Sequence, residues 1–89
     1  MATFNDLQFR HETNPLGFID RARFQFPNGY GISVIRGTYT YGGDEGLYEC
    51  AGLKDNRLCY DTPITNDVIG YCDEDKVNEI IKQIEELKV

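Results

Sequence analysis

The chain has 89 residues, enough for a single domain (1–89) with a small hydrophobic core but too few for a deep substrate cleft as well. Its 40% hydrophobic and 12% aromatic content predicts a folded globule, and its net charge of −6 disfavours direct nucleic-acid binding, which depends on cationic contacts. The exception would be a clustering of four arginines on one face: Arg10, Arg21, Arg23 and Arg36.

Residues 1–20 carry the weakest pattern and are expected to be weakly structured or to form an edge strand. Leu7-Gln8-Phe9-Arg10 alternates apolar and polar side chains as an edge strand would. Asn14-Pro15-Leu16-Gly17 predicts a turn, because proline fixes φ and glycine accepts positive φ. No basic segment followed by an apolar run is present, so no signal peptide is expected, and no apolar run is long enough to span a membrane.

A half-buried strand is predicted over residues 18–26. Its apolar and polar side chains alternate in part, so Arg21 and Arg23 are expected to face away from Ala22. Pro27-Asn28-Gly29 then predicts the tight turn of a hairpin, because asparagine and glycine tolerate the left-handed conformation.

The central strand of the sheet is predicted over residues 31–36, where β-branched side chains occupy both faces. A pliable glycine-rich connection follows over 37–46, and strand-like alternation resumes over 47–53. Asp55-Asn56 is the expected centre of a turn, and residues 58–60 are the expected return strand.

A C-terminal helix is predicted over residues 73–88, after a loop over 61–67. Asp73 suits the N-cap, and Val68-Ile69-Gly70-Tyr71 is expected to be a short apolar turn that closes one end of the core. Five aliphatic residues recur at helical spacing: Val77, Ile80, Ile81, Ile84 and Leu87.

Together these elements predict an α+β domain. A small antiparallel sheet of three to four strands forms a meander over 21–60, and the C-terminal helix packs on one of its faces. The second face would be wet or buried in a partner, which includes the homo-oligomer that an exposed sheet face can form.

No catalytic residue, metal or cofactor is predicted. His11 is the only histidine, and no nucleophile is tied to it by spacing, so it is expected to be exposed. Cys50, Cys59 and Cys72 include no C-x-x-C and fit no metal-ligand pattern with His11, so buried free thiols of a reducing compartment are expected.

The connection from Thr38 to Gly46 is the strongest candidate for a recognition loop. Tyrosine offers a large contact area at low entropy cost, and the loop combines Tyr39 and Tyr41 with Asp44, Glu45 and several glycines. The alternative is that the tyrosines fold back on the sheet as a lid over a small core.

Three segments resemble a family of short proteins encoded by tailed bacteriophages and prophages: Phe26 to Gly37, Tyr41 to Glu49, and Tyr60 to Tyr71. The resemblance covers roughly residues 7–87 and carries over no catalytic residue. It implies a phage origin and action in the cytoplasm of a bacterial host.

These observations favour a small acidic non-enzymatic protein that binds a host or phage protein, for example to inhibit a bacterial defence system. Its partner-binding residues would be Tyr39, Tyr41, Asp44 and Glu45 of the loop, with Arg21, Arg23 and Tyr48 on the exposed sheet face. A first alternative is a small-ligand binder or small enzyme that uses Asp61, Asp67 and His11 around the Asp61–Tyr71 loop. A second is a phage structural or assembly oligomer.

Overall fold

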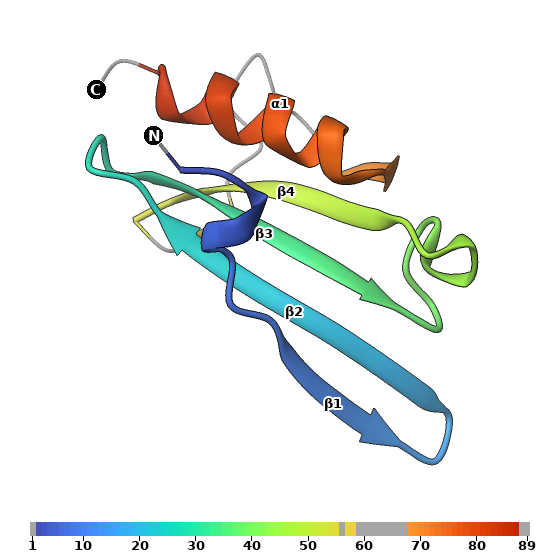
Figure 1. Cartoon of the computed structure of the whole chain (residues 1–89). Coiled ribbons are helices and arrows are strands. Elements are labelled where there is room, and N and C mark those ends of the chain that lie inside the picture. The colour runs from blue at the N-terminus through green and yellow to red at the C-terminus, as the bar shows by residue number, and fades with distance from the viewer. Residues whose placement is uncertain (1, 56, 59–67, 88–89) are drawn as a thin grey trace.

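A curled antiparallel sheet with one helix packed against it makes up the fold (Figure 1). The computed structural model describes residues 2–55, 57–58 and 68–87. Within them the strands are β1 (Arg10–Asn14), β2 (Gly17–Gln25), β3 (Tyr30–Gly37), β4 (Tyr48–Lys54), β5 (Arg57–Leu58) and β6 (Ile69–Cys72). The helices are α1 (Glu74–Glu85) and two short 3-10 turns, η1 (Phe4–Asp6) and η2 (Gly43–Glu45).

The strands run in the order β1-β2-β3-β4, each antiparallel to its neighbour. The far edge of β4 is shared, because β5 pairs with its end at Leu53 and Lys54 while β6 pairs with its start at Tyr48 and Cys50. The predicted α+β meander with a C-terminal helix is confirmed, but the sheet has six strands rather than three to four. The edge strand expected within residues 1–20 is present as β1, whereas β6 was not predicted and comes from a segment with a poor strand pattern.

The turns predicted at Asn14-Pro15-Leu16-Gly17 and at Pro27-Asn28-Gly29 are present, and each joins two antiparallel strands. Asn14 pairs with Gly17 across the first, and β1 begins at Arg10, where the predicted edge strand ended. In the second, the Phe26 N–H donates to Tyr30 O at 2.8 Å and the Gly29 N–H to Phe26 O at 3.1 Å. Gly29 has φ of 88°, which a residue with a Cβ rarely adopts.

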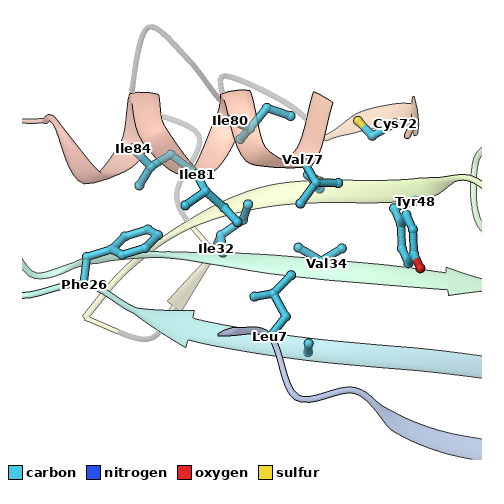
Figure 2. Close-up of a cluster of buried hydrophobic side chains, with 12 residues drawn as sticks. Leu7, Phe26, Ile32, Val34, Tyr48, Cys72, Val77, Ile80, Ile81 and Ile84 are labelled. Atoms are coloured by element: carbon cyan, nitrogen blue, oxygen red, sulfur yellow. The ribbon is translucent and has the colours of Figure 1, made fainter. Parts of the chain in front are cut away.

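The core lies between α1 and the face of the sheet that carries Ala22, Ile32 and Val34 (Figure 2). The helix begins after Asp73, whose side chain accepts from the Lys76 N–H at 2.8 Å as predicted for an N-cap. Four of the five predicted aliphatic residues are buried there, and the fifth is half-buried: Val77, Ile80, Ile81 and Ile84, with Leu87 at the end.

The segment Val68–Tyr71 is not the apolar turn that its composition predicted. Ile69–Cys72 forms β6, which pairs with β4 and satisfies polar backbone groups that a free sheet edge would leave unpaired. The sequence did not predict this strand because it contains Gly70, and glycine is depleted in strands. The predicted return strand is present at Arg57–Leu58, and its remaining residues, 59 and 60, lie outside the described part of the chain.

Candidate functional site

Exposed apolar side chains gather at one end of the sheet. The turn between β1 and β2 and the connection from β3 to β4 lie side by side at this end (Figure 1). Of the six large apolar side chains exposed among the described residues, five belong to it, and we call them the tyrosine end: Leu16, Phe18, Tyr39, Tyr41 and Tyr71. The sixth, Leu58, lies on β5.

Thr38 fixes the first half of the tyrosine end. The Phe18 N–H donates to Thr38 Oγ1 at 2.9 Å, and the Thr38 N–H donates to Phe18 O at 3.0 Å. Gly17 makes this approach possible, because a Cβ there would stand 2.0 Å from Thr38 Oγ1. Two hydrogen bonds therefore join Phe18, two residues after Leu16, to Thr38, the residue before Tyr39.

Tyr41 and Tyr71 form the second half of the tyrosine end. The Tyr71 N–H donates to Tyr41 O at 3.2 Å, and the Tyr41 N–H donates to Glu49 Oε1 at 3.2 Å. A Cβ on Gly70 would lie 2.5 Å from Tyr41 Cβ, so only glycine allows the two segments to approach so closely. The backbone that carries these two exposed tyrosine rings is therefore held by hydrogen bonds.

A groove of about 390 Å³ opens at the tyrosine end, on the sheet face that α1 does not cover. Leu16, Phe18 and Tyr39 line it on the apolar side. Arg21 and Glu49 line it from the sheet and supply one charge of each sign. The groove therefore offers apolar contact area with a polar border, as protein interfaces do.

Both tyrosines of the predicted recognition loop are exposed. Tyr39 is 80% exposed and Tyr41 is 59% exposed, which contradicts the alternative that they fold back as a lid on the core. Asp44 and Glu45 are exposed on η2, next to the tyrosines in the chain. Sequence reasoning missed Leu16, Phe18 and Tyr71, because only the folded chain brings the β1–β2 turn and β6 to this loop.

Tyr48 was wrongly placed on the exposed sheet face with Arg21 and Arg23. Tyr48 is only 9% exposed and lies on the helix side of the sheet, in the core cluster with Val34 and Val77 (Figure 2). Arg21 and Arg23 do face away from α1 and are exposed.

The N-terminal segment explains the burial of Tyr48. The ring centroids of Phe4 and Phe9 lie 5.2 and 5.5 Å from that of Tyr48, so the three rings pack together. The Arg36 guanidinium lies 5.0 Å from the centroid of the same ring. The sequence pattern of residues 1–20 was too weak to predict that Phe4 and Phe9 pack against Tyr48.

His11 joins a side-chain hydrogen-bond network at the border of the tyrosine end. Its Nδ1 lies 2.5 Å from Asp20 Oδ1, while Arg36 Nη2 donates to Asp20 Oδ2 at 3.3 Å. The hydrogen bond with His11 holds the pKa of Asp20 below its usual value, and Arg36 adds to the effect while burial opposes it. His11 is exposed as expected, and its ring stacks on Phe18.

Two residues of the first alternative site, Asp61 and Asp67, lie outside the described residues. Cys50 and Cys72 are buried and free, as predicted, and burial raises the pKa of both thiols; Cys59 also lies outside the described residues. Within the described ranges, no group of three or more His, Cys, Asp or Glu side chains could hold a metal ion.

Three of the four arginines considered above do cluster on one face. Arg10 and Arg21 are directly paired across β1 and β2, and Arg23 follows on the same face of β2. All three line a second groove, of about 370 Å³, on the side away from α1. Arg36 is on the other face, beside Asp20.

Comparison of the chain with protein-family models, curated proteins and solved structures gave no significant match. Among the described residues, no helix has the length and apolar character needed to cross a membrane.

Proposed function

We propose that this protein is a non-enzymatic binding protein that acts by stoichiometric contact with another protein. The observation that carries the proposal is the tyrosine end, where five apolar side chains are exposed and backbone hydrogen bonds join Phe18 to Thr38 and Tyr71 to Tyr41. Aromatic side chains dominate the energetics of protein interfaces, and little ordering entropy is lost when their backbone is already fixed.

The charges near the tyrosine end bear on the kind of partner. Asp44 and Glu45 are exposed on η2, and the whole chain carries a net charge of −6. A partner with a basic rim around an apolar pocket would be attracted at long range and held by the tyrosines at short range. Following the phage resemblance, we infer that the partner is a host or phage protein in the bacterial cytoplasm, such as a component of a defence system.

A pulldown with matched variants tests the proposal. Tagged protein is used to capture partners from a lysate of the bacterial host, alongside the double variant Tyr39→Ala/Tyr41→Ala and the control Leu58→Ala. Both variants remove exposed apolar surface, but only the first removes it from the tyrosine end. We expect one stoichiometric partner that the double variant loses and the control keeps.

Light scattering of the purified protein separates this function from self-assembly. A second copy of the chain could cover the same apolar surface, as the assembly alternative requires. If the wild type forms a dimer or larger species that is absent in the Tyr39→Ala/Tyr41→Ala variant, the tyrosine end mediates self-assembly and the partner proposal is wrong. If the wild type and the double variant capture the same proteins, the tyrosine end is not part of the interface.

A second pair of variants tests the electrostatic part. Asp44→Asn/Glu45→Gln keeps the shape of η2 and removes two negative charges. With the captured partner, we expect the association rate to fall and its dependence on salt to weaken, while the dissociation rate changes little. Equal association rates for the variant and wild type at low salt would contradict a basic partner surface.

A further inference from the structure

The sheet ends at β1, an edge strand whose outer side is uncovered in the described part of the chain. β1 pairs with β2 and with no other described strand, and Figure 1 shows it as the outermost strand on that side. All five of its residues, Arg10–Asn14, are exposed. A strand in this position presents unpaired N–H and C=O groups, onto which another extended chain can pair.

The hydrogen bonds of Phe18 show which backbone groups of β1 point outward. The Phe18 N–H donates to Thr38 Oγ1 and its carbonyl accepts from the Thr38 N–H, so both groups point away from β1. Thr13 stands opposite Phe18 in the register of β1 and β2, and the two residues therefore exchange no backbone hydrogen bonds. Because this pattern alternates along an antiparallel pair, the N–H and C=O groups of Thr13 and His11 face the open edge.

The side chains of Arg10 and Glu12 carry opposite charges on one face of the edge strand. Both lie on the face away from α1, because Arg10 is paired with Arg21 and Glu12 is two residues further along β1. Glu12 contacts Arg21, with its Oε1 2.8 Å from Arg21 Nε. Among the described residues Arg10 forms no ion pair, although it stands directly opposite Arg21, and like charges in this position destabilise a sheet. A further carboxylate beside Arg10 would offset this repulsion.

Antiparallel pairing of β1 with β1 of a second copy supplies that carboxylate in one register. A two-fold axis at His11 places Arg10 of each copy opposite Glu12 of the other, so two opposite-charge pairs form at once. The same register sets His11 opposite His11, and the outward-facing backbone groups of the two strands then exchange hydrogen bonds.

The neighbouring registers are less favourable. An axis at Arg10 would place the two Arg10 side chains opposite each other, and an axis at Glu12 would do the same with two carboxylates. An axis at Thr13 would set His11 opposite Pro15, which has no N–H to donate. An axis between two residues would set outward-facing groups against groups that are turned toward β2. Among these registers, the charges and the backbone groups favour the one centred at His11.

We propose that two copies of this chain pair through β1, antiparallel and centred at His11, to form one continuous sheet across a dimer. The pairing goes beyond the proposed contact with another protein and uses none of the side chains of the tyrosine end. Because the paired strands are antiparallel, the two tyrosine ends lie at opposite ends of the joined sheet. One dimer thus presents the proposed binding surface twice.

Sedimentation of the purified full chain over a range of concentrations tests the proposal, in about 0.15 M salt, which screens the repulsion between two acidic chains. We expect a monomer–dimer equilibrium, because each copy contributes one edge strand to a closed two-fold pair. The dimer should persist in the Tyr39→Ala/Tyr41→Ala variant, which distinguishes it from self-assembly through the tyrosine end. A protein that stays monomeric up to millimolar concentration would overturn the proposal.

Charge reversal within β1 tests the register. Arg10→Glu replaces both attractive pairs of the dimer with repulsive ones and should weaken dimerisation about tenfold or more. The exchange Arg10→Glu/Glu12→Arg should restore dimerisation, because opposite charges again face each other. Lys82→Glu, at an exposed position of α1, makes the same change in net charge as Arg10→Glu and should leave dimerisation unchanged. Equal effects of Arg10→Glu and Lys82→Glu, or no rescue by the exchange, would contradict pairing at His11.

Disulfide cross-linking locates the two-fold axis. In a Cys59→Ser background the two remaining native thiols are buried, so an introduced cysteine is the accessible one. Opposite residues of a hydrogen-bonded antiparallel pair have Cα atoms about 5.5 Å apart, a distance that a disulfide spans. We therefore expect His11→Cys to form a covalent dimer with oxidised glutathione. Thr13→Cys should not, because the two Thr13 positions are offset by roughly 14 Å along the strands, and preferential cross-linking of Thr13→Cys would show that the axis lies elsewhere.

Hydrogen exchange of the backbone amides gives a measurement that needs no variant. The N–H groups of His11 and Thr13 should become protected as the protein concentration rises, whereas the Glu12 N–H, which faces β2, should be protected throughout. Fast exchange at His11 and Thr13 where the dimer predominates would place the contact outside β1 and refute the proposal. Protection of these amides in a monomer, only after another protein is added, would assign the edge to that protein instead of a second copy.

Discussion

The side-chain amide nitrogen of Asn28 lies 3.0 Å from the carbonyl oxygen of Ile84 and joins the β2–β3 turn to the last turn of α1. The same nitrogen donates to Glu85 O at 3.2 Å and to Leu87 O at 3.0 Å. The final carbonyls of a helix have no partner within it, so a side chain from the sheet satisfies them here. Asn28 also stabilises its own turn, because its Oδ1 accepts from the Tyr30 N–H at 3.0 Å.

Replacement of Asn28 should therefore weaken both the turn and the helix end. We expect Asn28→Ala to lower the free energy of unfolding by about 1–3 kcal/mol, since carbonyls that are partly buried lose their donor. Asn28→Asp keeps the acceptor for Tyr30 but places a negative charge at the negative end of the helix dipole, so it should lose more. Urea denaturation measures the unfolding free energy of both variants, with Asn5→Ala at an exposed position as the control. Equal losses of stability for Asn5→Ala and Asn28→Ala would contradict the capping of α1 by Asn28.

Asp20 should make the stability depend on pH in the acid range. Its pKa is lowered in the folded state, chiefly by the hydrogen bond with His11, so the fold favours the ionised carboxylate. The resulting stabilisation is fully present above the unfolded pKa of about 3.9 and is lost as the pH falls through the lower folded value. We expect Asp20→Asn to be less stable than wild type at pH 7, and the difference to shrink toward zero below pH ~4.

His11→Ala provides the matched test of the cause. Without its strongest hydrogen bond, Asp20 should have a pKa closer to its usual value, so the acid loss of stability should spread over a narrower pH range. Denaturation curves at a series of pH values measure this. An unchanged pH profile in His11→Ala would mean that Arg36 and not His11 holds the carboxylate.

Alternation and helical spacing were enough to predict the main elements of the fold. The faces of β2 and the buried stripe of α1 follow from them, because Ala22 and Ile80 each sit in a long periodic segment. Tyr48 was misplaced because β4 carries apolar residues on both faces, so alternation alone gives no direction. Tyr48 lies on the face of the sheet where the rings of Phe4 and Phe9, from the N-terminal segment, pack against it.

The candidate sites were predicted only where they are local in sequence. Tyr39 and Tyr41 share one loop and were found, whereas Leu16 and Tyr71 reach the same end of the sheet through hairpin and strand pairing. The groove lined by Arg10, Arg21 and Arg23 depends on register, because a shift of one residue between β1 and β2 would turn Arg10 to the other face. No local pattern fixes that register.

Cys50 and Cys72 should be unreactive in the native protein. Both thiols are buried, and burial raises the pKa of each, so the reactive thiolate is scarce near neutral pH. In a Cys59→Ser variant, which leaves only these two thiols, we expect Ellman's reagent to label none within minutes at pH 8 and both after denaturation. Fast labelling of the native variant would contradict the packing of β4 against β6.

Thr38 should hold the tyrosine end in its binding shape. Thr38→Val keeps the size of the side chain but removes the oxygen that accepts from the Phe18 N–H at 2.9 Å. Because this bond is exposed, we expect a cost of only about 0.5–1.5 kcal/mol in unfolding free energy, with a local loss of amide protection at Phe18 in hydrogen-exchange NMR. The same variant should bind the captured partner more weakly, since ordering the end then becomes part of binding. Thr13→Val, opposite Phe18 on β1, is the control, and equal protection of Phe18 in the two variants would show that the tyrosine end is held by other contacts.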